Sequence, residues 1–211
     1  MKTHECDGKW HSGKYLPHFN ASHAYQHVTF HLADSLPAEA MSRIALEIEG
    51  FPEDKKSYER RKRLEDILDA GAGSCILRRS EVAEMTEKCL LHFDGERCNV
   101  IEWVVMPNHV HVLIEQREGW EVGDLVGSWK KWSARRIHQM MPEDAPEVVW
   151  QRDYWDRFIR NEAHFCAVVH YIHNNPVKAR LVGEAKDYRW GSARLRVSGG
   201  LDDLEIVAPT A

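Results

Sequence analysis

Hydrophobic and polar residues alternate along three stretches of the chain, which is the pattern of β-strands that bury one face. These stretches are Tyr25–Leu32, Asn99–Met106 and Val110–Gln116. Pro107-Asn108 lies in the short connection between the second stretch and the third. Because so short a connection joins neighbouring antiparallel strands, the pattern predicts a central β-hairpin.

Apolar residues recur instead at intervals of three and four in other parts of the chain, which indicates amphipathic helices. The predicted helices are Ala38–Glu49, Ser80–His92, Val122–Met140, Tyr154–Arg160 and Glu162–Asn174. Pro176 is expected to stop the last of them. A strand, helices, a hairpin and further helices follow one another, which predicts an α+β domain with helices packed on an antiparallel sheet.

The composition is that of an ordinary globular protein with one domain. The 211 residues include 28 Lys and Arg against 33 Asp and Glu, a formal net charge of −5. No apolar run is long enough for a membrane span, and the N-terminus is too polar for a signal peptide. The five cysteines are widely spaced. We therefore expect a cytoplasmic protein with reduced thiols and no membrane partner.

Charge is unevenly distributed along the chain. Residues 177–196 carry six Lys or Arg against two Asp or Glu, whereas residues 80–102 carry two against six. The net negative charge excludes a protein that coats nucleic acid without selectivity, because phosphate binding requires Lys and Arg. It permits a site-directed DNA-binding protein with a local basic surface.

Two histidines in the third predicted strand are separated by one residue. Side chains alternate between the faces of a strand, so His109 and His111 point to one face and Val110 to the other. Two neutral imidazoles on one face can chelate a divalent metal ion. Taken alone, such a pair is more typical of a polar face or a structural pair.

A tyrosine and an asparagine lie four residues apart in the last predicted helix, so Tyr171 and Asn175 share one helical face. An amide oxygen suits a hard cation, and a phenol can act as a nucleophile. Each residue has a simpler interpretation, because Tyr171 also fits a core position and Asn175 a C-cap before Pro176. Together with His109 and His111 they form a set that chance explains less well.

Basic residues accompany tryptophans in the second half of the chain. Aromatic rings can stack on bases while neighbouring cations neutralise phosphates. We predict DNA contacts for Lys130, Lys131, Arg135, Arg136, Arg152, Arg157, Arg160 and Lys178. For Arg152, Arg157 and Arg160, a role in structuring the site is an equal alternative. Trp129 and Trp132 are expected to face the core, and His27 and His31 to flank the site or pack.

Three motifs together resemble the REP-associated tyrosine transposases, a branch of the HUH single-tyrosine transposases, in which HUH stands for His, bulky hydrophobic, His. They are Met106-Pro-Asn-His-Val-His-Val112, Trp150-Gln-x-x-Tyr-Trp-Asp-Arg157 and Tyr171-Ile-His-Asn-Asn-Pro-Val-Lys178. Residues 15–18 and 28–37 are also similar to the N-terminal strand of this family. The resemblance spans roughly residues 14 to 195.

The resemblance implies a ferredoxin-like core and metal-dependent cleavage of single-stranded DNA at palindromic repeat hairpins. Tyr171 would be the nucleophile that leaves a 5′-phosphotyrosine and a free 3′-OH. His109, His111 and Asn175 would hold Mg²⁺ or Mn²⁺. The protein would act as a monomer or a homodimer.

The chain departs from the family pattern in two segments. Residues 50–79 form a charged helical insertion after the first strand, which is a DNA-handling addition, an oligomerisation element or a long connection. We expect an irregular N-terminal arm (1–24), a single transposase-like domain (25–196) and a flexible acidic tail (197–211). Two alternatives to a DNA strand transferase stay open. One is a domesticated protein that binds DNA hairpins without cutting them, and the other is a metal-dependent hydrolase of small phosphates.

Overall fold

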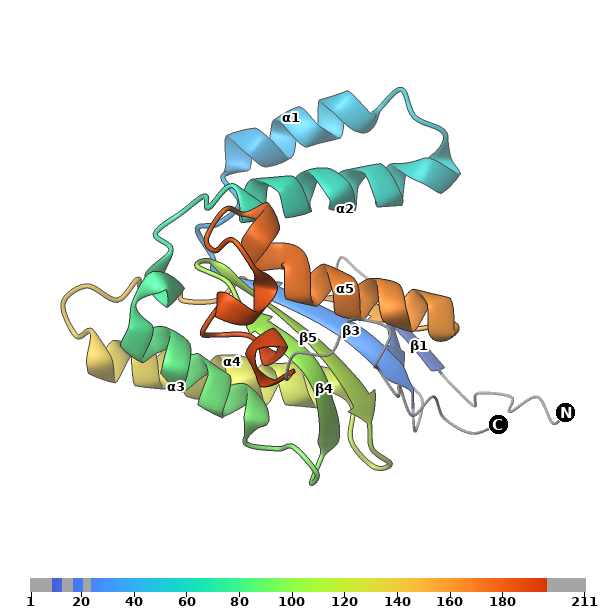
Figure 1. Ribbon diagram of the computed structural model, residues 1–211. Helices are drawn as coiled ribbons and strands as arrows, with labels where there is room; N and C mark the ends of the chain where they lie inside the picture. Colours follow the sequence, from blue (N-terminus) through green and yellow to red (C-terminus); the bar gives the residue numbers. More distant parts are fainter. Residues whose placement is uncertain (1–8, 13–16, 21–23, 197–211) are drawn as a thin grey trace, which may run out of the picture.

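A four-stranded antiparallel sheet forms the centre of the computed structural model (Figure 1). Its strands are β3 (Tyr25–His31), β4 (Cys98–Val105), β5 (His109–Gln116) and β6 (Trp155–Phe158), in the spatial order β4-β5-β3-β6. Helical segments connect β3 to β4 and β5 to β6, whereas β4 and β5 form the predicted hairpin. This is the ferredoxin-like arrangement, so the predicted fold class is confirmed.

Helices cover both faces of the sheet (Figure 1). One face packs against α3 (Ser80–Leu91) and α4 (Val122–Met140). The other face packs against α5 (Glu162–Lys178). The alternation along β3 and β5 explains this division, since Val28, Phe30, Val110 and Val112 belong to the core under α3 and α4. The neighbouring positions on both strands therefore face α5.

The C-terminal part of the domain consists of two short 3-10 helices, η2 (Ala185–Asp187) and η3 (Ser192–Leu195). The Tyr188 hydroxyl donates a hydrogen bond to the Val105 carbonyl at 2.9 Å, and the Val105 amide donates to the Trp190 carbonyl at 2.8 Å. These bonds attach the segment to the edge strand β4.

The predicted helix Tyr154–Arg160 is wrong, because Trp155–Phe158 is the edge strand β6. Its four residues are too few to display a period, and hydrogen bonds to β3 decide their conformation. Helix α5 continues past Pro176, contrary to expectation. Because Pro176 lies in the last turn, its missing N–H costs the helix only one hydrogen bond. The amides of Ala179 and Leu181 close the helix by donating to the carbonyls of Asn175 and Pro176.

The structure describes residues 9–12, 17–20 and 24–196. Within the predicted irregular arm, β1 (Lys9–Ser12) and β2 (Pro17–Asn20) form an antiparallel pair, so the prediction is wrong for these residues. Strands of four residues are too short to give a recognisable alternation. The remaining arm residues and the predicted acidic tail lie outside the described residues. None of the described helices combines the length and the apolar character that a membrane span needs.

The predicted helical insertion after the first strand is confirmed. It is a hairpin of α1 (Ala38–Ile48) and α2 (Glu53–Asp69), and Figure 1 shows α2 beside α5. The loop that follows α2 is fixed to the end of β3, because the Ser74 amide donates to the Asp34 carboxylate at 2.6 Å. Gly73 has a φ of +87° there, and a Cβ on it would lie 2.8 Å from the Asp34 carbonyl oxygen. This close approach requires glycine.

Candidate active site

The two histidines of the motif lie side by side on the face of β5 that α5 covers. Both His109 and His111 are fully buried, and their ring centroids are 4.7 Å apart. Val110 lies in the core on the opposite face, as the alternation predicts. The shared face is therefore confirmed.

Helix α5 brings the predicted tyrosine to the same place. The Tyr171 hydroxyl oxygen lies 3.4 Å from Nε2 of His111, and the two ring centroids are 5.1 Å apart. Asn175, one turn later, is buried. A single site thus unites the side chains that the sequence places in a strand and in a distant helix.

Neighbouring polar groups fix the orientation of both imidazoles. The Nδ1–H of His109 donates to Oδ1 of Asn108 at 2.7 Å, while Nδ2 of Asn108 donates to the Ala72 carbonyl at 2.8 Å. Nδ1 of His111 lies 2.8 Å from the Thr29 hydroxyl oxygen on β3. With Nδ1 engaged in this way, Nε2 of His111 faces Tyr171 on α5, and Nε2 of His109 faces Asp69 at the end of α2. Sequence reasoning missed Asn108 and Thr29, because only strand pairing and the turn geometry bring them to the rings.

Several buried polar atoms of this site lack a hydrogen-bond partner. They are Nε2 of His109 and both side-chain atoms Oδ1 and Nδ2 of Asn175. Buried polar groups are nearly always paired, so an unpartnered cluster indicates a place for a ligand. Imidazole nitrogens and an amide oxygen suit Mg²⁺ or Mn²⁺ only in part, because hard cations favour oxygen ligands. Within the described part of the chain, no three His, Cys, Asp or Glu side chains are placed, as they stand, so that they could hold a metal ion.

Burial controls the protonation of the site. It lowers the pKa of His109 to about 3 and holds the pKa of His111 well below its usual range, with smaller contributions from neighbouring charges. Both rings are therefore neutral at pH 7, as metal ligation requires. Burial also raises the pKa of Tyr171, and the charges of Glu65 and Asp69 raise it further. The phenol therefore needs a nearby positive charge to become a phenolate.

The helical insertion contributes side chains that the motifs do not include. Oδ1 of Asp69, at the end of α2, lies 3.8 Å from Nε2 of His109. Oδ2 of the same carboxylate pairs with Nζ of Lys178 at 2.7 Å. Arg61, Glu65 and Asp69 follow one another at intervals of four residues and so share a face of α2. This spacing is visible in the sequence, but it is common on solvated helices, so it does not single out a site.

The predicted DNA-binding residues of α4 lie on the face of the sheet away from His109. The Nζ atom of Lys130 donates to the carbonyls of Gln151, Arg152 and Asp153 at 3.0, 3.2 and 2.8 Å. Its ammonium group thus holds the chain that leads into β6. The residues Lys131, Arg135 and Arg136 are exposed. Trp129 is buried as predicted, whereas the core prediction is wrong for Trp132, which is 44% exposed next to Arg136.

Two other predicted DNA-binding residues, Arg157 and Arg160, lie on the same side of the sheet as Tyr171. Arg157 on β6 is opposite His27 of β3 in the strand register, and burial together with the Arg157 charge lowers the pKa of His27 to about 3. The charges of Arg157 and Arg160, after burial, also lower the pKa of His164. Arg152 is exposed in the connection before β6. Lys178 is held by Asp69 at 2.7 Å and by Asp66 at 3.3 Å, so its charge is already paired.

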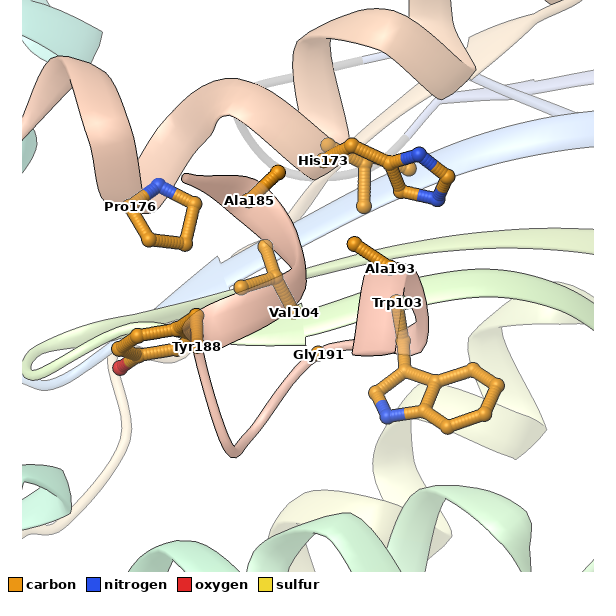
Figure 2. A pocket seen from close by; sticks show the side chains of 9 residues that line it. Trp103, Val104, His173, Pro176, Ala185, Tyr188, Gly191 and Ala193 are labelled. Atoms are coloured by element: carbon orange, nitrogen blue, oxygen red, sulfur yellow. The ribbon is translucent and has the colours of Figure 1, made fainter. Parts of the chain in front are cut away.

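A separate narrow hollow lies between α5, β4 and the C-terminal 3-10 helices (Figure 2). Figure 2 shows His173 and Pro176 from α5 above Trp103, Val104 and Tyr188. The imidazole of His173 pairs with the buried Glu102 carboxylate at 2.7 Å. Neither His109 nor Tyr171 lines this hollow. It is a packing seam that fixes α5 on the sheet and thereby sets the position of Tyr171.

The chain is similar to known transposases in sequence and in fold. Residues 76–175, which contain the histidine pair, Tyr171 and Asn175, match the family model "Transposase IS200 like". A solved structure of a REP-associated tyrosine transposase bound to a REP hairpin has the same fold, with a TM-score of 0.59 and 16% sequence identity. The alignment covers 90% of this chain and 88% of that one. The chain is thus similar to IS200-like transposases in sequence over residues 76–175, and to a REP-associated tyrosine transposase in fold.

Curated proteins with similar sequences include REP-associated tyrosine transposases. The REP-associated tyrosine transposase of Escherichia coli (strain K12) is 29% identical over 103 residues, which are 49% of this chain and 59% of the relative. A relative from Haemophilus influenzae is 25% identical over 48% of this chain and 67% of its own length. The chain is a relative of the REP-associated tyrosine transposases, so the resemblance carried by the three motifs is confirmed.

Proposed function

We propose that this protein is a metal-dependent single-stranded DNA endonuclease and strand transferase that acts on palindromic repeat hairpins. The observation that carries the proposal is the 3.4 Å approach of the Tyr171 hydroxyl to His111 in a buried site that also contains His109 and Asn175. A protein that only bound DNA would not need this set. The solved relative bound to a REP hairpin supports the class of substrate.

In this proposal the Tyr171 hydroxyl loses its proton to solvent and its oxygen attacks the scissile phosphorus. The P–O3′ bond breaks, the 3′ oxygen leaves as a hydroxyl after taking up a proton, and a 5′-phosphotyrosine remains on the protein. Mg²⁺ or Mn²⁺ held by His109, His111 and Asn175 would stabilise the charge that develops on the phosphate and favour the phenolate of Tyr171. The covalent phosphodiester conserves bond energy, so a 3′-OH can later rejoin the DNA without ATP.

The chain's own residues have defined parts in this reaction. Thr29 and Asn108 orient the imidazoles of His111 and His109. The guanidinium group of Arg157 lies on the same face as His27, where it can pair with a backbone phosphate. Tyr171 is half-buried where α5 packs on the sheet, which restricts the access of bulk water to its hydroxyl and so limits hydrolysis of the phosphotyrosine.

The test uses single-stranded DNA that carries a palindromic hairpin, with Mn²⁺ and purified protein. We expect a protein–DNA adduct that survives denaturing electrophoresis, that a chelator prevents and that Tyr171→Phe abolishes. Equal cutting by the wild type and by Tyr171→Phe would exclude Tyr171 as the nucleophile. Hairpin binding without any cutting, with either metal, would support the alternative of a non-catalytic hairpin-binding protein.

A further inference from the structure

Asp69 is unusual among the carboxylates of the insertion because it is buried. Its side chain is 8% exposed, whereas that of Asp66, one turn earlier on α2, is 55% exposed. Oδ2 of Asp69 pairs with Nζ of Lys178 at 2.7 Å, whereas Oδ1 lies 3.8 Å from Nε2 of His109, which is beyond hydrogen-bond distance. A carboxylate in such a place is stable only when positive charge compensates it.

The atoms around Asp69 lack partners as well. Nε2 of His109 and the amide of Asn175 are buried and unpartnered, and Oδ1 of Asp69 lies 3.8 Å from that Nε2. Two ligands at about 2.1 Å from one octahedral ion are about 3.0 Å apart when they are neighbours and about 4.2 Å apart when they are opposite. The separation of 3.8 Å lies between these values, so a shift of less than about 1 Å would bring the two atoms to a ligand separation. An ion between the two atoms would satisfy both.

The donor set also improves chemically when this carboxylate is included. Two imidazoles and one amide are neutral and offer a single oxygen, whereas Mg²⁺ and Mn²⁺ favour oxygen ligands and negative charge. Asp69 supplies both. In the arrangement described, the carboxylate also pairs with Lys178, whose side chain is 52% exposed and can turn towards solvent or DNA.

We propose that Asp69 is a ligand of the catalytic metal ion, so that the helical insertion completes the metal site. The proposal rests on the proposed metal-dependent function and deepens it. Lys178 pairs with Oδ2 and holds the carboxylate in place, which leaves Oδ1, the oxygen that faces His109, for the ion. The insertion is then part of the active site and not a surface addition.

The test measures Mn²⁺ affinity of the full-length protein without DNA, by electron paramagnetic resonance of the free aqueous ion. We expect Asp69→Asn, which keeps the size and removes the charge, to weaken binding by about 10-fold or more. Asp66→Asn is the matched control, since Asp66 pairs with the same lysine from the exposed face, and its affinity should equal that of the wild type. Circular dichroism verifies that each variant is folded.

A double variant separates a metal ligand from a simple ion-pair partner. The double variant Asp69→Asn/Lys178→Met removes both charges of the pair, so the net charge near the site is unchanged. If Asp69 only balances Lys178, the double variant will bind Mn²⁺ as the wild type does. If Asp69 is a ligand, the double variant will bind Mn²⁺ about 10-fold or more weakly than the wild type. Wild-type affinity in Asp69→Asn, or no Mn²⁺ binding by the wild type, would overturn the proposal.

The proposed function can fail independently of this one. If Mn²⁺ affinity depends on Asp69 but no Tyr171–DNA adduct forms, the proposed strand transferase activity is wrong and Asp69 is still a metal ligand. If the adduct forms normally but Asp69→Asn leaves Mn²⁺ affinity unchanged, the proposed activity stands and Asp69 is not a ligand.

Discussion

At the scale of single residues, the site depends on burial and on orientation. His109 and His111 are neutral because burial lowers their pKa values, and their rings are turned by Asn108 and Thr29. The four motif residues could be predicted from the sequence because their spacing places them on one strand face and one helix face. The residues that orient them could not, because their roles arise only when β3 and the turn before β5 meet the histidines.

Replacing Thr29 tests the orientation of His111. Thr29→Val preserves the shape of the side chain and removes the hydroxyl that lies 2.8 Å from Nδ1. We expect Mn²⁺ affinity to fall by about 10- to 100-fold, as is typical when a partner of a ligating histidine is lost. Isothermal titration calorimetry measures the affinity. An unchanged value would show that strand packing alone orients the ring.

His31 predicts how stability depends on pH. Burial lowers its pKa to about 4, opposed by a hydrogen bond to the Leu32 carbonyl, and the unfolded value is 6.5. Between pH 6.5 and 4 the unfolded chain therefore binds a proton that the native protein does not. The free energy of unfolding must fall as the pH falls in this window, by up to about 1.4 kcal/mol per pH unit for one such group.

The variant His31→Gln removes that group, so its stability should decline less steeply over the same window. Urea unfolding at a series of pH values measures the two slopes. Parallel slopes would show that His31 gains its proton in the native state as readily as in the unfolded one.

At the scale of secondary structure elements, long periodic segments were predictable and short ones were not. Helix α4 and the β4–β5 hairpin agree with the pattern because many residues repeat the same preference. Strand β6 has four residues, and only its hydrogen bonds to β3 make it a strand. The helical insertion was predicted as an element, but its contribution to the site was not, because packing against α5 determines it.

Gly73 holds the base of this insertion and can be tested directly. In Gly73→Ala the new Cβ would approach the Asp34 carbonyl oxygen at a φ of +87°. We expect a loss of about 2 kcal/mol or more in the free energy of unfolding. Gly95→Ala is the matched control, because Gly95 has a φ of +74° and open space around it, so the loss should be about 1 kcal/mol. Equal losses would mean that the contact with Asp34 is not tight.

At the scale of the whole molecule, the sheet separates two groups of cations. Lys131, Arg135 and Arg136 lie on α4, whereas Arg157 lies on the face of Tyr171. The sequence gives the basic residues but not the side of the sheet on which they lie. The net charge of −5 therefore hides two separate groups of basic residues. The DNA contacts predicted for α4 stay a prediction, and they would lie on the face of the sheet opposite to Tyr171.

Lys130 has a structural role, whereas its neighbour Lys131 is exposed and free to contact DNA, so variants of the two lysines should behave differently. Lys130→Met leaves the carbonyls of Gln151, Arg152 and Asp153 without this donor, so thermal unfolding should show a loss of about 1–3 kcal/mol. Lys131→Met should change stability by less than about 0.5 kcal/mol and weaken hairpin binding instead. The opposite assignment of the two effects would contradict the structure.

The most direct test of the account is to locate the covalent bond. The protein is incubated with Mn²⁺ and hairpin-bearing single-stranded DNA, the adduct is digested with protease and nuclease, and the modified peptide is sequenced by mass spectrometry. The account predicts a nucleotide joined through its 5′-phosphate to Tyr171 and a released strand that ends in a 3′-OH. Attachment to another residue, or cleavage that leaves no modified peptide, would contradict it.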